Sequence, residues 1–130
     1  DIPIRNEVFK CPAWSDDDHI AISTSVRLGF PLNLLCLVDA TGHVLSQEWI
    51  PAAEDNGSFY YGNNLFIKTS MVGSWNINFY DAHTLELRLK LNKQKLVSYG
   101  IDSPPTFAWI APDNRILIGS WNALFVFDFE

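Results

Sequence analysis

The chain has 130 residues, the size of one ordinary domain, and its 48% hydrophobic and 18% charged residues exclude a disordered polypeptide. The formal charge of −6 argues against nucleic acid and anionic membranes as general partners, because both bind basic surfaces. The apolar runs, such as residues 34–38, are far shorter than the roughly 18 residues that span a bilayer, so we expect one soluble unit over residues 1–130.

The first predicted unit covers residues 11–50. Its start, Ala13-Trp14, leads through an acidic turn into an alternating apolar strand at residues 20–23. Another apolar strand ends at Asp39, where Asp and Gly supply a tight turn into a final strand. Residues 1–10 precede this unit and have enough apolar character to form an outer, closing strand of another unit.

The second predicted unit covers residues 58–92. Tyr60 and Tyr61 lead through a Gly-Asn-Asn turn into an apolar strand, and a later strand ends at Asp81. From Leu85 to Lys95, leucines alternate with charged residues for most of the segment. This period of two predicts a strand with one apolar face rather than a helix.

The third predicted unit covers residues 105–130. Trp109 opens it as the counterpart of Trp14, again followed by an acidic turn and an apolar strand. The unit reaches Asp128 at the end of its third strand, and no sequence for an outer strand follows. We therefore expect three strands here, with a fourth supplied from elsewhere.

Three markers recur about every 42 to 48 residues along the chain. They are the aromatic positions near Trp14, Tyr61 and Trp109, the strand-ending aspartates, and the tetrapeptide Gly-Ser-Trp-Asn at residues 73–76 and 119–122. Four short strands per period of 40 to 50 residues are typical of β-propeller blades. The fold class predicted is all-β, with about three four-stranded propeller blades.

Residues 13–16, 20–23 and 36–42 carry a resemblance to a known fold family. They resemble WD40-like β-propeller repeats of the kind found in TolB and in the propeller domains of prolyl-oligopeptidase-type peptidases. The Asp-Ala-Thr-Gly turn at residues 39–42 is also similar to that of quinoprotein propellers, whereas the Trp-Asp and Gly-His signature of WD40 repeats is missing. The resemblance implies a propeller fold. It assigns no catalytic residue, because the peptidases carry their chemistry on a separate domain.

Three blades do not close into a ring, since closed propellers have four to eight. Because the chain begins at Asp1 rather than Met, one expectation is that it belongs to a larger propeller. The alternative is a homodimer in which two copies make six blades. A sandwich of the strands is a third possibility.

Several residues that suggest metal or anion binding have simpler interpretations. The run Asp16-Asp17-Asp18-His19 has ligand-type side chains but aligns with an ordinary turn, and His43 and His83 lie in unrelated turns, so no metal site or cofactor is predicted. Cys11 and Cys36 are not in a CxxC spacing; buried thiols of this kind favour the cytoplasm or nucleus. The basic cluster Arg88, Lys90, Lys93 and Lys95 is interpreted as protection of an outer strand.

No nucleophile elbow, glycine-rich phosphate loop or zinc-binding helix motif is present, which predicts a non-enzyme. The favoured function is a non-catalytic module that binds another protein through its loops. Trp14 and Trp109 are expected to pack between blades, which leaves other aromatic and loop residues for binding. The candidate binding residues are Arg27, Phe30, Pro31, Trp75 and Trp121. Two alternatives are a glycan-binding propeller that uses Trp75 and Trp121, and a substrate-gating part of a hydrolase or oxidoreductase.

Overall fold

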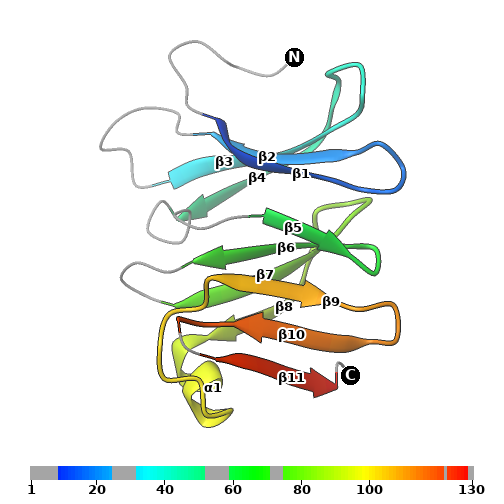
Figure 1. The fold of residues 1–130 in the computed structure, drawn as a ribbon. Helices are drawn as coiled ribbons and strands as arrows, with labels where there is room; N and C mark the ends of the chain where they lie inside the picture. The colour runs from blue at the N-terminus through cyan, green and yellow to red at the C-terminus, as the bar shows by residue number, and fades with distance from the viewer. Residues whose placement is uncertain (1–8, 25–31, 52–58, 71–74, 122, 129–130) are drawn as a thin grey trace.

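The computed structural model describes residues 9–24, 32–51, 59–70, 75–121 and 123–128, without the side chains of residues 9–12 and 24. Within these residues the chain forms three antiparallel sheets that lie one above another (Figure 1). The first sheet has the order β1-β2-β3-β4 and consists of β1 (Phe9–Trp14), β2 (Ile20–Thr24), β3 (Leu32–Val38) and β4 (Val44–Pro51). The predicted all-β class is therefore confirmed.

The other two sheets follow in chain order. The second sheet consists of β5 (Phe59–Gly62), β6 (Leu65–Ser70), β7 (Asn76–Asp81) and β8 (Leu87–Asn92). The third consists of β9 (Phe107–Ile110), β10 (Arg115–Gly119) and β11 (Leu124–Asp128). Among the described residues no sheet closes on itself, and no helix has the length and apolar character needed to cross a membrane.

Turn chemistry explains where the strands end. The β5–β6 hairpin turns at Asn63 and Asn64, whose positive φ angles of 51° and 62° are those of the tight turns that match strand twist. At the end of β3, the Asp39 carboxylate accepts hydrogen bonds from the backbone N–H groups of Thr41 (2.9 Å) and His43 (3.0 Å). Asp81 does the same after β7, so the recurring aspartates stabilise the turn into each fourth strand.

The hydrophobic core consists of layers between the sheets. One cluster joins the first and second sheets and includes Leu35, Leu37 and Phe66, all fully buried. A second cluster joins the second and third sheets and includes Ile67, Phe79 and Ile118. Every residue of β6 is buried, because the second sheet is covered on both faces. The predicted burial of Cys36 is confirmed, whereas the Cys11 side chain lies outside the described part.

The segment from Leu85 to Lys95 was predicted as one strand, and this is wrong at both ends. Leu85 lies in the turn before β8, with a φ angle of 62°, and is buried there. After Asn92 the chain forms the short helix α1 (Lys93–Ser98), in which Leu96 is fully buried. The Asn92 carboxamide oxygen caps this helix by accepting from the Lys95 N–H (2.9 Å), a local hydrogen bond that competes with strand continuation.

The predicted equivalence of Trp14 and Trp109 is also wrong, by one residue of register. Trp14 pairs with Ile20 at the end of its hairpin, but in the third sheet Ile110 holds that position and pairs with Ile116. The two tryptophans therefore occupy neighbouring rather than equivalent register positions in the first strands of their sheets. Trp14 is 56% exposed, whereas the Trp109 indole N–H donates to the Tyr61 carbonyl oxygen (3.0 Å) and links β9 to β5.

Candidate interaction surface

The tip of the β10–β11 hairpin presents a single large aromatic side chain. The Ser120 N–H donates to the Ala123 carbonyl oxygen (2.9 Å) and closes the turn. Trp121 lies within this turn with 73% of its surface exposed, so it contributes little to the core. The Trp121 indole is thus open to solvent in the described part of the chain, and its role in binding stays a prediction.

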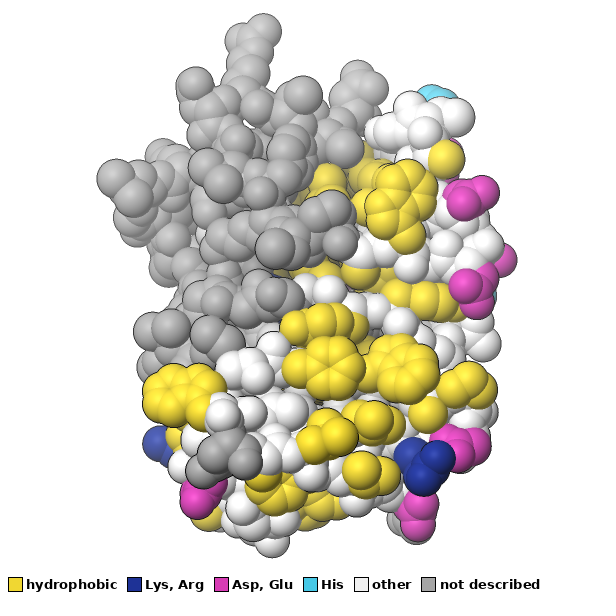
Figure 2. All heavy atoms as spheres, in the orientation of Figure 1, with side chains coloured by type: hydrophobic (Ala, Val, Ile, Leu, Met, Phe, Trp, Pro, Cys, Tyr) yellow, Lys and Arg dark blue, Asp and Glu magenta, His cyan; other side chains and the backbone are white. Residues whose placement is uncertain are grey.

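Two further apolar side chains of the same hairpin are exposed. Along β11, Phe125 and Phe127 pack against the core between the second and third sheets. Leu124 and Val126 point to the opposite face and are 60% and 51% exposed. We call Trp121, Leu124 and Val126 the terminal hairpin surface. Figure 2 shows hydrophobic side chains gathered on the viewed face over the second and third sheets.

The outer edge of β11 has unused backbone hydrogen-bonding groups within the described part of the chain. The carbonyl oxygens of Gly119 and Arg115 accept hydrogen bonds from the N–H groups of Thr106 and Ala111, which lie on the β9 side of β10. The alternate residues of β10 therefore direct their backbone groups to the other side and bond to β11. By the same alternation, the backbone groups of Leu124 and Val126 point away from β10. β4 and β8 occupy this position in the first and second sheets, but no described strand does so in the third.

Trp75, the other candidate tryptophan, differs from Trp121 in its surroundings. It lies just before β7, is half-buried and packs against the core between the second and third sheets. The Lys93 ammonium lies 4.7 Å from the centre of its ring and covers one face. The glycan-binding hypothesis therefore rests on Trp121. Arg27, Phe30 and Pro31 lie outside the described residues.

No family model matches this chain, so the chemistry of the terminal hairpin surface is the guide to what it binds. A search of the curated proteins found no significant match either. Exposed aromatic and aliphatic side chains beside an open strand edge are typical of surfaces that bind other proteins.

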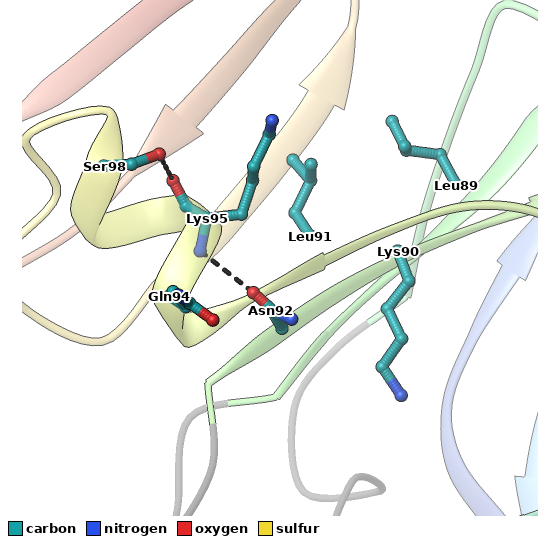
Figure 3. Close-up of a pocket in the computed structure, with 7 residues that line it drawn as sticks. All are labelled: Leu89, Lys90, Leu91, Asn92, Gln94, Lys95 and Ser98. Carbon is teal, nitrogen blue, oxygen red and sulfur yellow. Dashed lines mark hydrogen bonds between the residues drawn. The ribbon is translucent and has the colours of Figure 1, made fainter.

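Members of the basic cluster are held in separate local contacts. Arg88 forms an ion pair with Asp81 (3.1 Å), and the Lys95 ammonium lies 5.6 Å from the centre of the Tyr99 ring. A pocket of about 390 Å³ lies beside α1, and Lys90 and Lys95 extend from it in opposite directions (Figure 3). Asn92 and Ser98 in this pocket make hydrogen bonds that cap the helix. These contacts do not point to a shared anion site. Only Arg88 and Lys90 lie on the outer strand β8, whereas Lys93 and Lys95 lie in α1, so protection of the strand edge stays a prediction for the first two and is wrong for the others.

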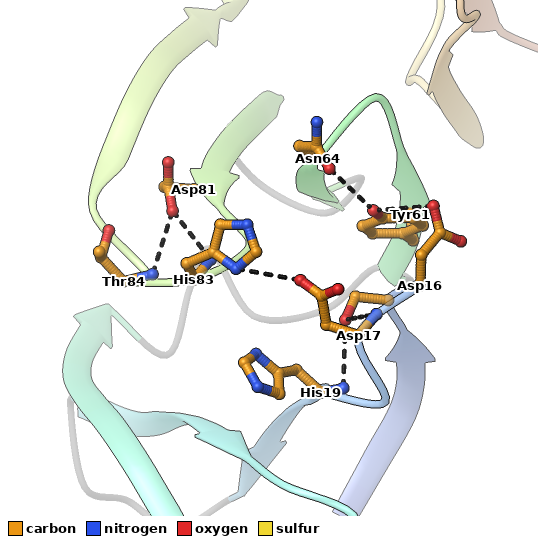
Figure 4. Close-up of polar contacts among 9 residues, drawn as sticks. Asp16, Asp17, His19, Tyr61, Asn64, Asp81, His83 and Thr84 are labelled. Carbon is orange, nitrogen blue, oxygen red and sulfur yellow. Dashed lines mark hydrogen bonds and ion pairs between the residues drawn. The ribbon is translucent and has the colours of Figure 1, made fainter.

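Polar side chains connect the turns of the first and second sheets (Figure 4). The Asp17 carboxylate lies 3.3 Å from Nδ1 of His83, and the Tyr61 hydroxyl donates to Asp16 over a longer distance of 3.4 Å. Burial is the main cause that raises the pKa of Tyr61, and the nearby aspartates add to it. In the part of the chain that the structure describes, no group of three or more His, Cys, Asp or Glu side chains could hold a metal ion.

A hydroxyl, an imidazole and a carboxylate meet in the exposed turn after β3. The Thr41 hydroxyl lies 2.7 Å from both the Asp39 carboxylate and Nδ1 of His43. The Thr41 hydroxyl donates its one proton to the Asp39 carboxylate, so this proton is not directed at the His43 imidazole. These hydrogen bonds, with that of Thr41 as the largest cause, lower the pKa of Asp39 to about 2. The arrangement stabilises a turn and does not activate a nucleophile.

Leu124 and Val126 were not among the candidate residues predicted from the sequence. Apolar residues occupy both alternating positions of the strand, a pattern typical of a strand covered on both faces. The available signal was that the sequence predicts only three strands for this unit. Among the described residues, no strand pairs with the outer edge of β11.

Proposed function

We propose that this chain is a non-catalytic interaction module that binds another protein through the terminal hairpin surface. The observation that carries the proposal is the exposure of Trp121, Leu124 and Val126 on one hairpin beside an open strand edge. Aromatic anchors and unpaired strand edges both favour protein partners, the first by burial of apolar area and the second by added backbone hydrogen bonds. Neither feature supplies a nucleophile, an acid or a base.

The three sheets are proposed to be propeller-like blades, and their repeated register supports this. Counted from the aspartates that end the third strands, Ala21, Ile67 and Leu117 occupy the same position. Ala21 packs towards the second sheet and Ile67 towards the third. The equivalent face of the third sheet, with Leu117 and Val126, is thus the one that a following blade would cover. A second copy, a longer chain or a different partner are the candidate sources of that cover.

Site-specific photo-crosslinking tests the proposal. A photoreactive phenylalanine analogue is placed at Trp121 or Val126 of the full chain, and at Leu45 as a control that is 47% exposed in β4 of the first sheet. In an extract of the source cells, we expect one discrete protein adduct from the first two positions and none from Leu45. Adducts that are diffuse, absent or equal at all three positions would count against the terminal hairpin surface.

The identity of the captured protein then follows from mass and mutation. Light scattering after size exclusion gives about twice the chain mass of 14.8 kDa if the partner is a second copy. With any partner, Trp121→Ala together with Val126→Ser should abolish binding while the circular dichroism spectrum is retained. Normal binding by this variant would refute the proposal.

A further inference from the structure

A pocket of about 240 Å³ lies beside β11, between the second and third sheets. Leu89 and Leu91 of β8 line one side of it, and Phe127 of β11 lines the other. The Tyr99 ring, which follows α1, packs against the Phe127 ring with 4.8 Å between the ring centres. The pocket therefore lies on the face of β11 opposite to the terminal hairpin surface, because the Val126 side chain points the other way. A mainly apolar space of this size suits one large apolar side chain.

The first and second sheets show what covers the Phe127 position when a fourth strand is present. Val38, Tyr80 and Phe127 each come directly before the aspartate at the end of the third strand, so they hold equivalent positions. Val44 of β4 stands opposite Val38, and Leu87 of β8 stands opposite Tyr80. Val38 and Tyr80 are 3% and 4% exposed, whereas Phe127 is only half-buried. An apolar residue of an antiparallel fourth strand is thus what the third sheet lacks among the described residues.

The backbone of β11 can hold such a strand at its open edge. The backbone groups of Phe125 and Phe127 bond to β10, and those of Val126 point to the open edge. A strand bonded to Val126 places its neighbouring residue opposite Phe127, in the kind of pair whose side chains lie closest together. Because side chains alternate along a strand, that residue points to the face with the pocket, and so do the residues two positions away from it.

The rim of the pocket carries more positive than negative charge. Lys95 lines the pocket, and its ammonium lies 5.6 Å from the centre of the Tyr99 ring. Among the described residues Lys95 has no ion-pair partner. The adjoining pocket beside α1 shares this lysine and adds Lys90 (Figure 3). Asp128 is the one carboxylate among the described residues that line either pocket, so the charge favours a segment with acidic residues on its inward face.

We propose that β11 binds an extended, acidic segment of a partner protein as the fourth strand of the third sheet, with one large apolar side chain in this pocket. The segment runs antiparallel to β11, as β4 and β8 run against β3 and β7. Acidic residues two positions from the apolar one lie on the same face, where Lys95 meets them. This inference rests on the proposed function, since it names the partner segment that occupies the open edge beside the terminal hairpin surface.

Amide hydrogen exchange, followed by NMR on the isotopically labelled 130-residue chain, tests the added strand and the pocket together. The probe is acetyl-Thr-Glu-Thr-Leu-Thr-Glu-Thr-amide, in which the leucine and both glutamates share one face. We expect saturable binding that slows exchange of the Val126 N–H at least about tenfold, since this group gains a hydrogen bond, while the Phe127 N–H, already bonded to β10, changes little. The matched peptide with serine in place of leucine should bind at least about tenfold more weakly, because it leaves the pocket unfilled. Unchanged exchange at Val126, or equal affinity for the two peptides, would overturn the proposal.

A charge swap makes the test specific to Lys95. Lys95→Glu alters an exposed side chain, so it should leave the fold intact, weaken binding of the acidic peptide about fivefold, and favour the peptide in which lysine replaces both glutamates. Lys90→Glu is the matched control, because it makes the same change in net charge on a side chain that extends in the opposite direction (Figure 3). It should keep the preference for the acidic peptide. A Lys95→Glu chain that keeps this preference as well would contradict the proposed contact.

Two further outcomes separate this inference from the proposed function. If light scattering shows a dimer and the Val126 N–H is protected without peptide, a second copy occupies the edge, which overturns the inference but not the proposed function. If the peptides fail while the photo-crosslinks from Trp121 and Val126 persist, the added strand and its pocket are refuted and the terminal hairpin surface is not. Loss of those crosslinks refutes the proposed function itself.

Discussion

Replacement of Gly62 by alanine should separate two strands that belong to different sheets. Gly62 ends β5, where the backbone of β9 passes close to it. A methyl group added there would lie 2.5 Å from the Trp109 indole nitrogen and 2.6 Å from the Ile110 carbonyl oxygen. The indole can rotate, but the carbonyl belongs to the backbone of β9. The clash is therefore relieved only if the second and third sheets move apart locally.

The magnitude follows from two effects. Overpacking of a well-packed contact typically costs about 1–3 kcal/mol. Movement of Trp109 also breaks its hydrogen bond to the Tyr61 carbonyl oxygen, which is worth about 0.5–1.5 kcal/mol. We expect Gly62→Ala to lower the free energy of unfolding by about 2–4 kcal/mol, a large part of the stability of a domain.

Urea denaturation followed by circular dichroism measures this loss, with two variants as controls. Gly119→Ala places a methyl group 3.3 Å from Cβ of Phe107, a tight but tolerable contact, so it should cost clearly less. Trp109→Phe removes the indole N–H and should cost about 1 kcal/mol, which isolates the hydrogen bond from the clash. A loss within about 0.5 kcal/mol for Gly62→Ala would refute the close approach of β5 and β9.

Two further outcomes can be measured on the same chain. Phe79→Ala empties a fully buried position in the core between the second and third sheets and should lower the free energy of unfolding by about 3–5 kcal/mol, whereas a loss below about 1 kcal/mol would contradict that packing. Asp39→Asn removes a carboxylate whose pKa is held at about 2, below its ordinary value of 3.8. Because the lowered pKa stabilises the folded state only while the group is ionised, the difference in stability from wild type should be complete above about pH 4 and vanish as the pH falls towards 2. A difference that is constant from pH 6 to pH 2 would show that the charge of Asp39 has no part in it.

Local patterns were sufficient to predict the all-β class and the division into three strand-rich units. Asp39 and Asp81 illustrate why, since each stabilises a turn through hydrogen bonds to residues within three or four positions along the chain. The alternation of apolar residues likewise reports on strands directly. That the sheets are propeller blades remains a prediction, because closure depends on contacts beyond the described residues.

The same patterns could not separate Trp75 from Trp121, although both stand in the same tetrapeptide. Lys93 of α1 covers Trp75, whereas no described helix follows the third sheet to cover Trp121. Trp14 and Trp109 were likewise predicted to be equivalent because the spacing of two similar motifs does not show a difference of one residue in register.

Outside residues 85–95, the sequence alone determined most strands and turns, because hydrogen bonds and apolar alternation over a few neighbouring residues decide both. Only the tertiary structure decided which side chains remain open to a partner, because exposure depends on the sheet or helix that packs against each face. Trp75 and Trp121 are the clearest case: they stand in the same tetrapeptide, but one packs against the core between the second and third sheets and the other is 73% exposed.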